Sequence, residues 1–224
     1  AFDLTAACSG FLFALITASQ FLKGGNFKRA VVIGADQLSS FVDWNDRRSC
    51  ILFGDGAGAL TIEATNEFDN FIGFDMRTDG ERGCFLNLPS KNNKDSIIDN
   101  IDFLSGSFSP IQMNGQEVYK FAVKEVPIIL DKLFRKTNYS SDEVDWLVLH
   151  QANQRILDSV GDRLKIPREK ILSNLEKYGN TSAATIPLMM DEAIRNNRIK
   201  QNDIIATSGF GAGLSWGAAL IKWG

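Results

Sequence analysis

Apolar residues along the chain follow two spacings, one typical of helices and one of strands. Repeats of three and four positions mark helices, and short aliphatic runs between turn residues mark strands. The predicted helices cover residues 11–22, 115–137, 154–164 and 183–196. The predicted strands cover residues 1–4, 28–36, 60–64, 71–74, 85–86, 145–149, 171–172, 204–206 and 216–221. This alternation predicts an α/β fold, interrupted by a polar excursion over residues 66–114.

The chain also contains an internal repeat. Cys8 and Asn180 each open a segment that passes from small residues through a helix, a glycine or asparagine stop and a lysine to an aliphatic strand. Cys8 precedes Ile33 by as many positions as Asn180 precedes Ile205. Two copies of one unit predict a pseudo-two-fold arrangement with Cys8 and Asn180 at equivalent helix starts. The alternative is that two α/β units share a generic rhythm.

The glycine-rich segment at residues 53–59 carries a Gly-x-Gly-x-Gly pattern. In a dinucleotide-binding loop such a pattern leads into a helix, whereas here it leads into a predicted strand. We therefore expect these glycines to permit close backbone packing or a bulge rather than to bind phosphate.

Composition and charge exclude several classes of protein. Hydrophobic residues make up 44% of the chain and charged residues 23%, as in ordinary globular domains. The net charge of −3 gives no bias toward nucleic acid, and no apolar run is long enough to span a membrane. Three widely spaced cysteines indicate neither a disulfide framework nor a metal site, and they favour a reducing compartment. Because the chain opens with alanine inside a predicted strand, we expect a fragment or a processed chain.

Cys8 lies between small residues where the first predicted strand meets the first helix. The free N–H groups and the dipole at a helix start favour a thiolate, which is the reactive form of cysteine. A buried structural cysteine is the alternative, since cysteine is among the most buried residue types. We interpret Cys50 and Cys84 as structural.

Two further polar residues stand where a strand or a turn meets a helix. His150, the only histidine, follows the strand at 145–149, and Asn180 precedes the last helix. Ligands bind at the carboxyl ends of strands in open α/β sheets. Taken separately, the alternatives are a structural histidine and a helix N-cap. Together with Cys8 these residues supply a nucleophile, a proton or hydrogen-bond partner, and a neutral polar donor.

Four motifs around these residues resemble the signatures of the β-ketoacyl-acyl-carrier-protein synthase III family. They are Ala6-Ala7-Cys8-Ser9-Gly10 and the segments 150–155, 179–183 and 209–213, in family order over nearly the whole chain. The resemblance implies a thiolase-like fold with duplicated βαβαβ halves in α-β-α-β-α layers, the first half incomplete. Residues 1–65 would form the C-terminal part of the first half, and residues 66–224 would form the second half.

The resemblance implies an acyltransferase, the initiating condensing enzyme of type II fatty-acid synthesis. Cys8 would accept an acyl group from acetyl-CoA or another short acyl-CoA. Malonyl-acyl-carrier-protein would then bind, and His150 and Asn180 would hydrogen-bond its thioester oxygen as carbon dioxide leaves. Two such donors can stabilise the developing charge by roughly several kcal/mol. Both thioesters are substrates, and no cofactor is implied.

The resemblance also implies roles for residues around this centre. The backbone N–H groups of Cys8 and Ala212 would form a second oxyanion site, and Arg47 would stack on the CoA adenine. The other implied contacts are Phe53, Asn153 and Phe210 for substrate, and Lys120 and Arg155 for the acidic carrier protein. For Arg47, Lys120 and Arg155 the alternative is an exposed charge without a partner molecule.

The family further implies a homodimer in the bacterial cytoplasm or the plastid stroma, with a preceding third of the chain that is absent here. We expect the fragment alone to be inactive. A polyketide-, quinolone- or 3-hydroxy-3-methylglutaryl-CoA-type condensing enzyme of the same fold remains an alternative, although the last type needs a glutamate and none adjoins Cys8. A non-catalytic homologue and a thiol hydrolase that uses Cys8 and His150 are the others.

Overall fold

The computed structural model describes residues 1–65, 69–98 and 101–224, with side chains described outside residues 91–105. Its largest sheet has four strands in the order β3-β10-β9-β8. These are β3 (Phe71–Thr78), β8 (Trp146–Leu149), β9 (Ile204–Gly211) and β10 (Ser215–Lys222). β10 pairs antiparallel with β3 and β9, whereas β8 and β9 are parallel. The predicted strand at 171–172 is reduced to one bridge, between Ile171 and Leu147.

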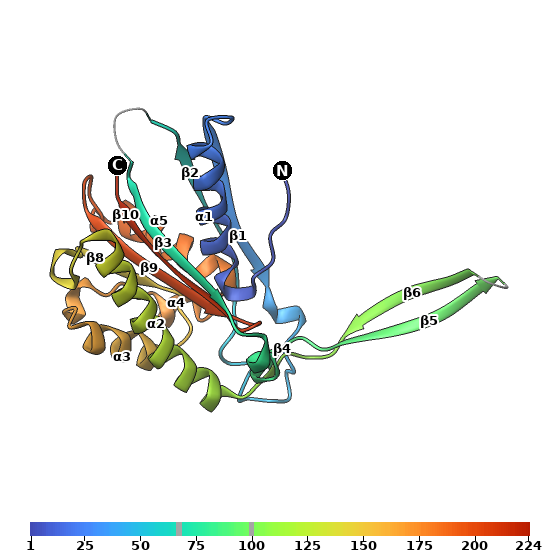
Figure 1. Cartoon of the computed structure of the whole chain (residues 1–224). Helices are drawn as coiled ribbons and strands as arrows, with labels where there is room; N and C mark the ends of the chain where they lie inside the picture. The colour runs from blue at the N-terminus through green and yellow to red at the C-terminus, as the bar shows by residue number, and fades with distance from the viewer. Residues whose placement is uncertain (66–68, 99–100) are drawn as a thin grey trace.

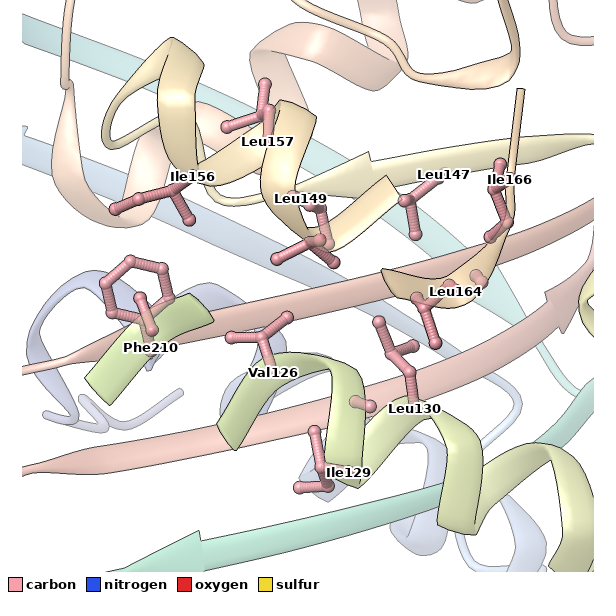
Figure 2. Packing of buried hydrophobic residues seen from close by; sticks show 14 of the residues in the cluster. Val126, Ile129, Leu130, Leu147, Leu149, Ile156, Leu157, Leu164, Ile166 and Phe210 are labelled. Atoms are coloured by element: carbon pink, nitrogen blue, oxygen red, sulfur yellow. The ribbon is translucent and has the colours of Figure 1, made fainter. Parts of the chain in front are cut away.

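Helices α2 (Gly115–Thr137) and α3 (Gln154–Leu164) cover one face of this sheet (Figure 1). The apolar residues that predicted these helices form the interface. Figure 2 shows Val126 and Leu130 of α2 with Leu149 of β8 and Ile156 of α3 in one buried cluster. Burying each aliphatic side chain contributes about 1.5–3 kcal/mol.

Helices α1 (Gly10–Lys23) and α5 (Thr185–Arg195) lie between the four-stranded sheet and a second sheet (Figure 1). The second sheet consists of β1 (Arg29–Gln37) and β2 (Asp55–Glu63), which are antiparallel. The residues that fill the space between the sheets are Phe11, Leu12, Leu15, Ile16, Val32, Ile186, Met189, Met190, Ile205 and Ala219. The described elements therefore stack as β, α, β and α layers.

Glycines set the close approach of β1 and β2 to the α5 region. Gly34 and Gly58 face each other across the two strands. A Cβ at Gly58 would lie 2.9 Å from the Cβ of Pro187, and one at Gly56 would lie 3.1 Å from Leu188. The structural interpretation of the glycine-rich segment is confirmed, although the strand begins at Asp55 rather than at residue 60.

The polar excursion contains more strand than its sequence predicted. β5 (Ser90–Ile98) and β6 (Ile101–Phe108) form an antiparallel hairpin that projects from the body of the molecule (Figure 1). At its base, β4 (Leu86–Asn87) pairs with β7 (Gln112–Met113), and the Ile111 N–H donates to the Phe41 carbonyl over 2.8 Å. The expectation of only two short strands was wrong, because cross-strand backbone bonds form here without a regular apolar alternation.

The internal repeat has a structural counterpart, in a different register from the predicted one. The 3-10 turns η1 (Ala7–Ser9) and η6 (Ser182–Ala184) precede α1 and α5, and β1 and β9 follow them. Each element of the second copy begins the same number of residues after its counterpart. Both turns start at a left-handed residue, with φ of 46° at Ala7 and 54° at Ser182. Cys8 therefore corresponds to Ala183. Its predicted equivalence with Asn180 was wrong by three residues.

Two other predictions concern the borders of the repeat. Residues 1–4, predicted as a strand, have no regular structure, because no strand of the described chain pairs with them. The division at residues 65 and 66 adjoins residues outside the described ranges and stays a prediction. The remaining short helices are η2 (Leu38–Ser40), η3 (Gly80–Phe85), η4 (Ser141–Glu143), η5 (Arg168–Lys170) and α4 (Leu175–Tyr178).

Candidate active site

Cys8, His150 and Asn180 meet at one cavity of about 120 Å³. They come from three separate parts of the chain: the turn η1, the end of β8 and the segment before η6. The remaining lining residues are Leu52, Phe53, Leu86, Met113, Gly115, Val118, Tyr119, Ala152, Asn153, Ile156 and Phe210. The lining is apolar apart from a few polar groups, which is the usual composition of a small-molecule site.

Cys8 is held against the end of β9 and against η6. A Cβ at Gly211 would lie 2.6 Å from the Cys8 nitrogen, so only glycine lets the strand approach the turn this closely. The Ser182 hydroxyl donates a hydrogen bond to the Cys8 sulfur over 3.3 Å. Ser182 is buried with its neighbour Cys8, and the pair joins the two copies of the repeat.

The electrostatics of Cys8 differ from those expected at a helix start. Burial raises the pKa of its thiol to about 11, and the nearby Asp36 charge adds to the rise. The hydrogen bond from Ser182 and a backbone hydrogen bond act in the opposite direction but are outweighed. The predicted resting thiolate is therefore wrong for this structure, and Cys8 is a neutral thiol at pH 7.

His150 follows β8 and is 1% exposed. Its N–H donates to the Ser208 carbonyl over 2.8 Å, which extends the pairing of β8 with β9. In the side chain, Nδ1 lies 2.7 Å from Thr185 Oγ1, and the ring meets Phe210 edge to face with centroids 5.3 Å apart. Burial lowers the pKa of His150 to about 3, so the imidazole is neutral at pH 7.

Asn180 is fixed by its backbone and by its amide oxygen. Its N–H donates to the Leu52 carbonyl and its carbonyl accepts from the Gly54 N–H, each over 2.9 Å. The side-chain Oδ1 accepts the Ser182 N–H over 2.9 Å. This bond is an Asx turn that leads into η6, whereas the N-cap of η6 is Thr181, so the predicted N-cap role of Asn180 was wrong. The same bond leaves its Nδ2 as a donor at the cavity.

The residues predicted to bind substrate, the carrier protein and the oxyanion divide into two groups. Phe53, Asn153 and Phe210 line the cavity, although Asn153 also caps α3 by accepting the Arg155 N–H over 2.8 Å. The structure places the other four outside it. Arg47, Lys120 and Arg155 are exposed, and Ala212 follows the glycine that touches Cys8.

Sequence reasoning missed the residues that hold Cys8 and His150 in place. Ser182 and Thr185 each contact one of these side chains, and Asp36 accepts the Ala183 N–H over 3.0 Å. Ser182 and Thr185 lie two and five positions after Asn180, at the start of a predicted helix, and these hydroxyl residues were a usable signal. The contact of Asp36 depends on the packing of β1 against η6, which the sequence pattern does not show.

Three further observations concern the described ranges as a whole. Cys8, Cys50 and Cys84 are free cysteines. Within these ranges, no three or more histidine, cysteine, aspartate or glutamate residues gather as metal ligands would. No described helix combines the length and the apolarity that crossing a membrane requires.

The pKa of Cys8 gives a test of the site without substrate. Alkylation of Cys8 by iodoacetamide is expected to accelerate about tenfold per pH unit from pH 7 to 10, because the thiolate is reactive and the pKa is about 11. Ser182→Ala should slow the reaction by about 5-fold at pH 8, since it removes a hydrogen bond worth about 1 kcal/mol. Peptide mass spectrometry would measure both rates.

Ser19→Ala is the matched control, since Ser19 is also buried but donates to the Ile16 carbonyl away from the cavity. It should leave the alkylation rate of Cys8 unchanged. A rate that levels off below pH 9 would contradict the prediction, because it would mean that Cys8 is already ionised.

Comparisons with known proteins agree with this geometry. The family model described as 3-Oxoacyl-[acyl-carrier-protein (ACP)] synthase III matches residues 2–80, and the model of its C-terminal part matches residues 134–223. A β-ketoacyl-[acyl-carrier-protein] synthase III from Prochlorococcus marinus (strain MIT 9215) is 94% identical over 224 residues, which are 100% of this chain and 67% of the relative. The chain thus spans about two thirds of that relative's length.

Solved structures give the same result. The 3-oxoacyl-[acyl-carrier-protein] synthase III of Aquifex aeolicus VF5 is 38% identical with a TM-score of 0.88, covering 99% of this chain and 67% of that one. The priming β-ketosynthase of the R1128 polyketide pathway is 28% identical with a TM-score of 0.85, covering 99% and 65%. The α/β arrangement described above is therefore thiolase-like. On all of these grounds the chain belongs to the β-ketoacyl-[acyl-carrier-protein] synthase III family, the condensing acyltransferases that initiate fatty-acid synthesis.

Proposed function

We propose that Cys8 is the nucleophile that accepts an acetyl or other short acyl group from CoA, and that His150 and Asn180 serve the condensation with malonyl-acyl-carrier-protein. The observation that carries this proposal is the convergence of the three side chains on one small, mostly apolar cavity. A nucleophile with a neighbouring base and a polar donor is the arrangement that covalent acyl transfer requires.

The first step is the transfer of the acyl group from CoA to Cys8. Cys8 and His150 are both neutral in the resting cavity, because burial raises the thiol pKa and lowers the imidazole pKa. The thiol proton therefore leaves only as the sulfur attacks the thioester carbon. The bond from that carbon to the CoA sulfur breaks, and an acyl-cysteine and free CoA remain.

In the second step the malonyl group loses carbon dioxide. Negative charge develops on its thioester oxygen, and Asn180 Nδ2 would donate to it, since the bond from the Ser182 N–H to Oδ1 fixes the orientation of the amide. His150 supplies the second donor. Removing one such donor from a preorganised site costs about 10²–10³ in rate. The resulting carbanion attacks the acyl carbon, and the bond from that carbon to the Cys8 sulfur breaks. Acetoacetyl-acyl-carrier-protein is released, and the Cys8 sulfur takes up one proton from solvent to regenerate the neutral thiol.

The surrounding residues fit roles in substrate binding. Phe53, Asn153 and Phe210 line the cavity and would contact the pantetheine arm and the acyl group. Arg47, Lys120 and Arg155 are exposed, as contacts with CoA and with an acidic carrier protein require. The N–H groups of Cys8 and Ala212 would bind the oxyanion of the acyl transfer.

The proposal extends to the working form of the protein. We propose a cofactor-independent homodimer in the cytoplasm, or in a plastid stroma. The three free cysteines support a reducing compartment. The net charge of −3 is slightly negative, so it supports neither nucleic-acid binding nor attachment to an anionic membrane.

The proposed function predicts an acyl-enzyme that is competent for condensation. Full-length protein incubated with radiolabelled acetyl-CoA should gain one acetyl group by intact mass, and malonyl-acyl-carrier-protein should chase the label into a ketoacyl product. Loss of the label as free acetate would instead indicate a thiol hydrolase. No adduct with any short acyl-CoA would overturn the proposal.

The similarity to a priming polyketide synthase favours one second candidate, a condensing enzyme of secondary metabolism. The same assay with a series of acyl-CoA chain lengths separates the two. The fatty-acid role predicts the fastest adduct with acetyl-CoA, whereas a strong preference for a longer or branched primer would favour the second candidate.

A further inference from the structure

One hydroxyl group connects His150 to the turn that holds Cys8. Thr185 Oγ1 lies 2.9 Å from the Ser182 carbonyl oxygen and 2.7 Å from His150 Nδ1. Thr185, Ser182 and His150 are 2%, 3% and 1% exposed, so water does not compete for these contacts. The Ser182 hydroxyl bonds the Cys8 sulfur, so the start of η6 contacts Cys8 and the start of α5 contacts His150.

The chemistry of these groups determines where the protons lie. A carbonyl oxygen can only accept, so the single hydroxyl proton of Thr185 belongs to the bond with Ser182. In this arrangement Thr185 Oγ1 offers a lone pair to His150, and Nδ1 is the donor, so both hydrogen bonds form together. A neutral imidazole carries one proton, and that proton is therefore on Nδ1.

The other ring nitrogen is left as an acceptor. His150 Nε2 has no hydrogen-bond partner among the described residues, and His150 lines the cavity together with Cys8. We propose that Thr185 is a positioning residue that holds neutral His150 in the Nδ1–H tautomer, so that Nε2 accepts the Cys8 thiol proton during acyl transfer. This inference rests on the proposed function and adds a residue to it.

The proton balance of acyl transfer closes on this arrangement. The Cys8 proton moves to Nε2 as the sulfur attacks the thioester carbon. When the carbon–sulfur bond to CoA breaks, Nε2 returns that proton to the CoA sulfur, which leaves as a thiol. His150 ends neutral, in the tautomer in which it began, and no other proton donor is needed.

Condensation needs the opposite tautomer, because a donor to the malonyl thioester oxygen must carry its proton on Nε2. That form requires His150 to take up one proton from solvent at Nε2 and to release the Nδ1 proton to solvent. The lone pair left on Nδ1 then accepts a hydrogen bond from the Thr185 hydroxyl, which rotates away from the Ser182 carbonyl. This rotation replaces two hydrogen bonds, from Nδ1–H to Thr185 and from Thr185 to the Ser182 carbonyl, with the single bond from Thr185 to Nδ1. Thr185 thus favours acyl transfer at rest and permits the second tautomer once Cys8 is acylated.

The test compares Thr185→Val, which keeps the shape, with Thr185→Ser, which keeps the hydroxyl. Nitrogen-15 NMR of the full-length protein distinguishes the two ring nitrogens, and a His150→Gln variant identifies the His150 signals. The wild type and Thr185→Ser should show the proton on Nδ1. Thr185→Val should shift it toward Nε2, since a buried Nδ1–H would then lack a partner.

The kinetic readout separates positioning from folding. Single-turnover acetyl transfer should slow about 10- to 100-fold in Thr185→Val, while decarboxylation of malonyl-acyl-carrier-protein, measured as carbon dioxide release, should fall less. Thr185→Ser should restore acetyl transfer to within about 3-fold of the wild type. Thermal melting would check that both variants fold.

Two results would overturn the inference: a resting proton on Nε2 in the wild type, or unchanged tautomer and acetyl transfer in Thr185→Val. The NMR measurement needs no substrate, so the tautomer of His150 and the proposed acyl transfer are tested separately. A protein that forms the acyl adduct but carries the proton on Nε2 overturns this inference alone. A protein with the expected tautomer that forms no adduct overturns the proposed function.

Discussion

Replacing Cys8 with alanine is expected to abolish the acyl-enzyme and to lower the condensation rate by at least about 10³-fold. The reason is chemical, because alanine has no group that can carry the acyl chain between the two steps. Cys8 is buried at the cavity, and removing one sulfur atom there leaves the turn η1 and its backbone contacts in place. Intact mass after incubation with acetyl-CoA measures the adduct, and the ketoacyl product measures condensation.

The other two cysteines provide matched controls. Cys50 and Cys84 are free, and neither lines the cavity. Cys50→Ala and Cys84→Ala should keep the adduct and the condensation rate within about 2-fold of the wild type. Cys8→Ala should still release carbon dioxide from malonyl-acyl-carrier-protein, because His150 and Asn180 remain. An acetyl adduct that persists in Cys8→Ala would assign the nucleophile to another residue.

Gly34→Ala is expected to destabilise the fold by about 3 kcal/mol and to impair the site at the same time. A Cβ at Gly34 would collide with the Ala183 carbonyl and would lie 3.1 Å from the Cβ of Phe11. The backbone of η6 would have to move, since a carbonyl cannot rotate away as a flexible side chain can. Overpacking of this kind costs about 1–3 kcal/mol or more. Urea unfolding monitored by circular dichroism would measure the loss.

The same displacement should reach catalysis, because Ser182 adjoins Ala183 and bonds the Cys8 sulfur. We therefore expect acyl transfer by the folded fraction of Gly34→Ala to slow as well. Gly80→Ala is the matched control, since a Cβ there would meet nothing within 4 Å. Equal stability of the two variants would show that β1 does not pack against η6 as described.

The sequence predicted the parts of this molecule whose signal is local. The helical spacing of Val118, Phe121 and Leu133 located α2, and the residues around Cys8, His150 and Asn180 indicated the cavity. Contacts between distant segments were less predictable. The thiol pKa of Cys8 depends on how deeply β9 and η6 bury it, and the tautomer of His150 depends on Thr185. The β5–β6 hairpin was missed, because its pairing leaves no regular apolar alternation in the sequence.

The hydrogen bond between Ser182 and Cys8 joins residues that are 174 positions apart. Contacts of such long sequence separation form late, since the chain must close a large loop before they give any stability, and proteins rich in them fold slowly. A nascent chain cannot complete this cavity until Phe210, the last residue that lines it, has left the ribosome. Under the proposed function, acyl transfer by Cys8 would therefore report that η1 and η6 have docked.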